Sequence, residues 1–122
     1  MRLWLSKLYC LLIGSTLQFF FSQFSVAEVS YDKQIKPILD EYCVECHSGW
    51  FPDGGLRLDT RENILEGGKQ GAAVIPGKPG KGWLINLIKT EPGRYSKMPP
   101  GKEQLDTEQI NMIKNWIAEG AR

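Results

Sequence analysis

Apolar residues between Val29 and Tyr42 recur every three or four positions, as on one face of a helix. This stripe consists of Tyr31, Ile35, Ile38, Leu39 and Tyr42. Pro37 interrupts the pattern, and we expect it in the first turn of the main helix, where its missing N–H has no hydrogen bond to lose. The predicted helix leads directly into Cys43.

Two shorter helices are predicted in the middle of the chain. The first begins after a capping residue, Asp59 or Thr60, and runs through Leu65. The glycine pair at 67–68 should end it. The second covers Trp83 to Lys89, where apolar side chains again share one helical face. The intervening segments are rich in glycine, proline and other turn residues and should be irregular. They cover residues 48–60, 67–82 and 91–102.

The last helix has the clearest boundaries. Asp106 and Gln109 stand in the relation of a capping box, and Gly120 is placed to end the helix. Its apolar stripe contains Ile110, Ile113, Trp116 and Ile117. No segment shows the period-two alternation of a strand. The pattern therefore predicts a mainly α fold.

The first 27 residues differ in character from this domain. Arg2 and Lys7 give a positive start, residues 8–21 are largely apolar, and small residues precede Glu28. These features are typical of a secretory signal peptide. We therefore expect a signal peptide at 1–27, cleavage after Ala27, and a single domain at 28–122.

That domain would be periplasmic or secreted. The alternative is an uncleaved membrane anchor formed by residues 3–21, a stretch almost long enough to span a bilayer.

Charge and cysteine content narrow the class of protein. The 122 residues include 15 Lys and Arg against 14 Asp and Glu, without a clustered basic face, so we expect no nucleic-acid partner. Of the three cysteines, Cys10 leaves with the signal peptide. The exported domain would keep only Cys43 and Cys46, and a disulfide between them would close too small a loop to stabilise much.

The segment Cys-Val-Glu-Cys-His at residues 43–47 has the C-x-x-C-H pattern for covalent attachment of haem c. Cys43 and Cys46 can each add to a vinyl group of one macrocycle, and His47 can bind the iron as proximal ligand. A structural zinc would need two further ligands. A thioredoxin-like redox pair would need a βαβ context. A disulfide beside a chance histidine is the remaining alternative.

The second axial ligand has two candidates in the exported domain. Met98 lies in a loop stiffened by two following prolines, which suits a distal iron ligand. Met112 lies beside the apolar stripe of the last helix and is more typical of a packing residue.

Five segments resemble the planctomycete-type cytochrome c domain, in order along the chain. They are IKPILDEYCVECH, GGLRLDTRENILEGG, VIPGKPGKGWL, MPP and LDTEQINMIKNWIAEGA. The resemblance implies a mainly α, class I-like cytochrome c fold with several helices and long loops around one covalent haem. It implies electron transfer, haem attachment at Cys43 and Cys46, and iron ligation by His47 and Met98.

Other residues have two interpretations each. Arg57 is a candidate for contacting a haem propionate, or for pairing with an acid such as Asp59 or Asp53. Trp50 and Phe51 are candidates for packing on the haem. Four lysines, at positions 78, 81, 97 and 102, can flank an exposed haem edge and guide a partner or simply face solvent.

Together these features predict an exported monohaem c-type cytochrome that carries single electrons between redox protein partners, with no substrate turnover. The alternative is a haem-based sensor or ligand-binding protein with an open or displaceable sixth iron site.

Overall fold

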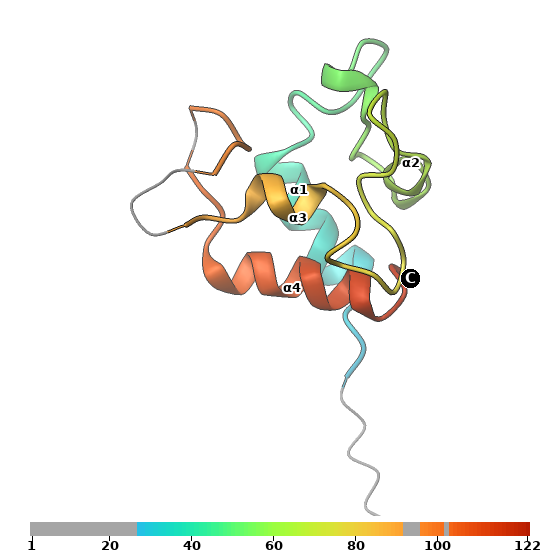
Figure 1. The fold of residues 1–122 in the computed structure, drawn as a ribbon, viewed down its shortest axis with the longest axis vertical. Helices are drawn as coiled ribbons and strands as arrows, with labels where there is room; N and C mark the ends of the chain where they lie inside the picture. The colour runs from blue at the N-terminus through green and yellow to red at the C-terminus, as the bar shows by residue number, and fades with distance from the viewer. Residues whose placement is uncertain (1–26, 92–95, 102) are drawn as a thin grey trace, which may run out of the picture.

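A computed structural model describes residues 27–91, 96–101 and 103–122 (Figure 1). The predicted signal peptide and the alternative anchor fall almost entirely outside this range. Within the described residues there are no strands, and the fold is mainly α as predicted. The elements are η1 (Tyr31–Ile35), α1 (Lys36–Tyr42), η2 (Asp53–Gly55), α2 (Arg61–Glu66), α3 (Leu84–Ile88) and α4 (Thr107–Ala118). None of these helices is long and apolar enough to cross a bilayer.

The first predicted helix is two elements in succession. Residues 31–35 form one turn of π-helix, η1, which begins where the Ser30 hydroxyl accepts a hydrogen bond from the Lys33 N–H. It continues into α1, with Pro37 in the first turn as predicted. The apolar stripe did not reveal the π-turn, because a single wide turn leaves its buried residues on the same face. Helix α1 ends at Cys43.

The two short helices are also confirmed. Thr60, rather than Asp59, caps α2, and its hydroxyl accepts a hydrogen bond from the Asn63 N–H at 3.2 Å. Gly67 ends α2 with φ of 84°, a conformation that disfavours other residues. Helix α3 is one residue shorter at each end than predicted.

Helix α4 begins and ends as predicted. The Asp106 carboxylate accepts from the Gln109 N–H at 2.7 Å, and the Gln109 side chain accepts from the Asp106 N–H at 3.0 Å. The helix packs against η1 and α3, and it lies below α3 in the view of Figure 1. Trp116 is buried and lies with its ring centroid 5.6 Å from that of Tyr31. Helix α4 therefore covers one side of the core.

Polar contacts tie the start of the described chain to its end. The Val29 N–H donates to the Glu119 carboxylate at 2.7 Å, and the Arg122 guanidinium lies 3.1 Å from the Glu28 carboxylate. The last carbonyls are also bound. Trp116 Nε1 donates to the Arg122 carbonyl at 2.9 Å, and Arg61 Nε donates to the Ala121 carbonyl at 2.7 Å. We refer to these contacts as the terminal tie.

Candidate cofactor site

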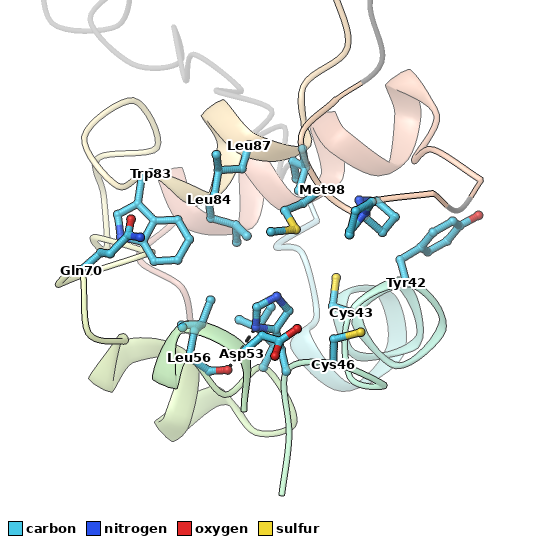
Figure 2. A pocket seen from close by; sticks show the side chains of 16 residues that line it. Tyr42, Cys43, Cys46, Asp53, Leu56, Gln70, Trp83, Leu84, Leu87 and Met98 are labelled. Atoms are coloured by element: carbon cyan, nitrogen blue, oxygen red, sulfur yellow. Dashed lines mark hydrogen bonds between the residues drawn. The ribbon is translucent and has the colours of Figure 1, made fainter. Parts of the chain in front are cut away.

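A cavity of about 310 Å³ opens between α1, α3 and the loops that follow them. This volume lies at the lower end of the range for cofactor and small-molecule sites. Its lining is largely apolar and comes from segments far apart in sequence (Figure 2). The lining residues are Tyr42, Cys43, Cys46, His47, Asp53, Gly54, Leu56, Leu58, Gln70, Trp83, Leu84, Leu87, Ile88, Met98, Pro99 and Pro100.

Both cysteines of the predicted attachment motif reach this cavity. Helix α1 ends at Cys43, and the turn that follows is closed by the Cys46 N–H, which donates to the Cys43 carbonyl at 3.2 Å. The two thiols are free and lie on the same wall in Figure 2. Cys43 is buried and Cys46 is exposed.

The environment of Cys43 argues against a redox-active thiol pair. Burial raises the pKa of the Cys43 thiol to about 11. Reactive thiols of that class have a lowered pKa, because the thiolate is the nucleophile. The structural zinc alternative also lacks support, since the described residues contain no cluster of three or more candidate metal ligands among His, Cys, Asp and Glu. Cys43 is therefore not the activated thiol that a redox pair of this kind requires.

One ring nitrogen of His47 is hydrogen-bonded to the backbone. Its Nδ1 lies 3.2 Å from the Leu56 carbonyl oxygen, the dashed contact in Figure 2. Because a carbonyl can only accept, Nδ1 donates in this contact, and Nε2 is the ring nitrogen left to bind a metal. The backbone of His47 is fixed as well: its N–H donates to the Cys43 carbonyl, and its carbonyl accepts from the Leu58 N–H. This is the arrangement expected of a histidine that binds a metal through Nε2.

The structure also brings Met98 into the cavity, and it does not bring Met112 there. Figure 2 shows the Met98 thioether pointing into the cavity from the wall opposite Leu56 and Cys46. Its N–H donates to the Leu87 carbonyl at 3.0 Å, which ties the loop to α3. Met112 packs against the core from α4. Met98 and His47 therefore share one cavity.

A single glutamine holds the segment that carries Met98. The Ser96 N–H donates to Gln104 Oε1 at 2.8 Å, and Gln104 Nε2 donates to the Pro99 carbonyl at 3.1 Å. The Ser96 hydroxyl lies close to both Gln104 Oε1 and the Met98 carbonyl. The segment is thus held on both sides of Met98. The sequence did not single out Gln104 or Ser96, because no local spacing links them.

Trp83 contributes a polar group that the sequence analysis missed. Its indole Nε1–H is buried without a hydrogen-bond partner among the described residues, and the side chain lines the cavity beside Gln70. Buried donors are rarely left unpaired in proteins, so an acceptor is expected from a bound group. A carboxylate of haem would satisfy it. The pattern had shown Trp83 only as part of an apolar helical face.

The remaining candidates lie outside the cavity lining. Arg57 is exposed, with its guanidinium 2.8 Å from the Asp59 carboxylate. Hydrogen bonds from Arg57 and then Asn63 lower the pKa of Asp59. The contact of Arg57 with a propionate stays a prediction. Trp50 and Phe51 do not line the cavity and are almost fully exposed, and their packing on the cofactor stays a prediction.

The predicted lysines are also absent from the cavity lining. Those at positions 78, 81 and 97 are exposed and do not line it. Position 102 lies outside the described residues. Their role in guiding a partner stays a prediction.

The donors around the cavity fit haem c. Two thiols, one imidazole and one thioether meet at an apolar site, and Trp83, whose buried indole N–H is unpaired among the described residues, also lines it. Comparison with curated proteins gave no match, and comparison with solved structures gave none either. The family model described as planctomycete cytochrome C matches residues 43–102, from the first cysteine of the motif past Met98. The chain therefore carries a domain of the planctomycete cytochrome C family, whose cofactor is haem c and whose general role is electron transfer.

Proposed function

We propose that this protein is an exported monohaem c-type cytochrome that carries single electrons between redox proteins. The observation that carries the proposal is the convergence of Cys43, Cys46, His47 and Met98 on one apolar cavity. Haem, when bound, supplies reversible one-electron chemistry at its iron. The protein's own contribution is to hold the cofactor, fix its axial ligands and limit the access of water.

Each residue has a distinct role in this proposal. Cys43 and Cys46 would form thioethers, so that the cofactor would stay attached when the fold opens. His47 would hold the iron through Nε2, with the Leu56 carbonyl fixing the orientation of its ring by accepting from Nδ1. Met98 would supply a second ligand to the iron. Trp83 would donate its indole N–H to a haem carboxylate.

The anchoring of Met98 favours a carrier over a sensor. A sensor or ligand-binding protein needs a sixth iron position that is open or easily vacated. Here the backbone of Met98 is tied to α3 through Leu87, and the segment around it is tied to Gln104. These bonds oppose the withdrawal of Met98. They support simple electron transfer without substrate turnover.

One mass measurement tests attachment, haem number and export together. The protein would be produced in a host that matures c-type cytochromes in the periplasm, and its intact mass recorded under denaturing conditions. We expect residues 28–122 plus one haem. A folded product of this host without haem would refute the proposal. A membrane-held product that begins at Met1 and carries haem would show that the N-terminal segment is an uncleaved anchor and not a signal peptide.

Met98→Ala and Met112→Ala form a matched pair for the distal ligand. Met98→Ala should abolish the weak far-red sulfur-to-iron absorption band, lower the reduction potential and allow carbon monoxide to bind the reduced protein. Met112→Ala should leave all three unchanged and lower only the free energy of unfolding. If Met112→Ala alone removed the band, Met98 would not be the ligand. If neither change removed it, the sensor function would be favoured.

A further inference from the structure

Trp50 and Phe51 are the large hydrophobic side chains that the described structure leaves most open to solvent. They are 95% and 97% exposed. Each such side chain buries roughly 150–250 Å² when covered, so the pair presents about 300–500 Å² of apolar surface. The largest apolar patch on a typical monomer is of this size and is often functional.

The pair lies close to the cofactor cavity. It stands at the apex of a loop whose base is closed by the Asp53 N–H, which donates to the Cys46 carbonyl at 3.0 Å. Cys46 and Asp53 both line the cavity and are both exposed, so they mark part of its mouth. Trp50 is four positions after Cys46 in the chain, a span of at most about 14 Å. A molecule that covers the aromatic pair therefore lies near the Cys46 edge of the cavity.

The chain around this loop carries acidic charge. Residues 37–56 contain four Asp and Glu and no Lys or Arg, whereas the whole chain has 15 basic and 14 acidic residues. The four acids are Asp40, Glu41, Glu45 and Asp53, and all are exposed. Lys36 pairs with Asp40 at 2.6 Å, which neutralises one of them. Lys69 lies beside η2 with its side chain over Gly55 and reduces the charge at that end. Exposed acidic side chains thus flank the aromatic pair in the sequence, Glu41 before it and Asp53 after it.

We propose that Trp50 and Phe51, with the acids at positions 41, 45 and 53, form the docking surface for a redox protein whose contact patch is apolar and bordered by Lys and Arg. The inference rests on the proposed electron-carrier function. Transient redox complexes bury less than about 1,200 Å² in total, or about 600 Å² on each partner. The aromatic pair alone supplies most of that area. The acids supply steering and orientation at the edge through which an electron leaves or enters.

The charges also distinguish this partner from other occupants. A second copy of the chain would bring like charges together, and a membrane rich in anionic lipid would be repelled. A partner guided by the lysines at 78, 81 and 97 would need an acidic surface. Those lysines do not line the cavity, whereas Asp53 does.

The test measures electron exchange between the haem-loaded protein and gold electrodes coated with defined monolayers. One surface mixes ammonium-terminated and methyl-terminated chains and reproduces the basic, apolar partner. The other is carboxylate-terminated and reproduces an acidic partner. We expect faster electron transfer on the ammonium and methyl surface, with a rate that falls as salt is added.

Three double variants assign the effect to residues. Trp50→Ser with Phe51→Ser should slow transfer on the ammonium and methyl surface about tenfold. Glu41→Gln with Glu45→Gln should slow it about threefold and weaken its salt dependence. Lys78→Gln with Lys81→Gln is the control and should leave the rate unchanged. All six substitutions are at exposed positions, and the absorption spectrum and potential of each variant verify an intact haem site.

Two results would overturn the docking surface while leaving the carrier function in place. One is faster transfer on the carboxylate surface that is lost in the lysine variant. The other is no change in the Trp50 and Phe51 variant. Co-sedimentation with neutral lipid vesicles that depends on Trp50 would show a membrane contact instead. A sample without haem and without a redox wave on either surface would overturn the carrier function itself, and this inference with it.

Discussion

The side chain of Gln104 holds the Met98 segment on both sides. If Met98 binds the iron as proposed, Gln104→Ala should let it leave the iron more often. Two hydrogen bonds are lost outright: the Ser96 N–H loses its acceptor, and the Pro99 carbonyl loses its donor. The Ser96 hydroxyl still has the Met98 carbonyl as an acceptor at 2.6 Å, so we do not count its contact with Gln104.

The size of the effect follows from these two bonds. A typical intramolecular hydrogen bond contributes about 0.5–1.5 kcal/mol net, so the pair contributes about 2 kcal/mol. At about 1.4 kcal/mol for each factor of ten, the equilibrium between bound and released Met98 should shift roughly 30-fold toward release. The bond between the Met98 N–H and the Leu87 carbonyl remains and limits the loss.

The assay follows the far-red band of the oxidised protein during titration with imidazole, which competes for the iron once Met98 has left. Gln104→Ala should lower the imidazole concentration at half-displacement about 30-fold. Gln109→Ala is the matched control: it removes one capping contact from α4, with the Asp106 N–H, and does not touch the loop. It should lower the free energy of unfolding and leave the imidazole titration unchanged. Equal titrations of wild type and Gln104→Ala would refute the role of Gln104.

Two further predictions concern a buried hydroxyl and a buried indole. Burial chiefly raises the pKa of Tyr31 to about 12, so the unfolded chain ionises this group first, near pH 10. Its contribution to folding stability is complete below pH 10 and is lost as pH rises to about 12. With Tyr31→Phe, the free energy of unfolding measured with denaturant should therefore fall less between pH 10 and about pH 12. An unchanged fall in this free energy would contradict the prediction. Trp83→Phe removes the unpaired N–H and should lower the reduction potential measured by voltammetry. Arg57→Gln should not, because Arg57 is engaged with Asp59 at the surface. The opposite outcome would assign the propionate to Arg57.

The features that the sequence predicted correctly are local ones. Pro37, the Thr60 cap and the pair of Asp106 and Gln109 act within a few residues, so their spacing alone fixes where helices begin. The C-x-x-C-H motif is equally local, because Cys43, Cys46 and His47 belong to one turn. Such signals do not depend on how distant parts of the chain pack.

The features that the sequence did not reveal depend on distant contacts. The Leu56 carbonyl that orients His47 is a backbone group and has no signature of its own. Trp83 counts as apolar in any periodic pattern, and only its burial without a partner marks it as a donor. The sequence also did not reveal that Trp50 is exposed. A tryptophan is usually expected in the core, and the loop that carries Trp50 does not place it there.

The terminal tie has a consequence for how this unit can be joined to other polypeptides. Because residues 28–29 lie against Glu119 and Arg122, both ends leave the domain at the same place. Chains whose ends meet tolerate insertion into a host loop, fusion in tandem and circular permutation, since no linker has to cross the fold. None of the residues in the tie lines the cofactor cavity. The domain can therefore be added as a redox module to larger architectures without disturbing the residues that line its cofactor cavity.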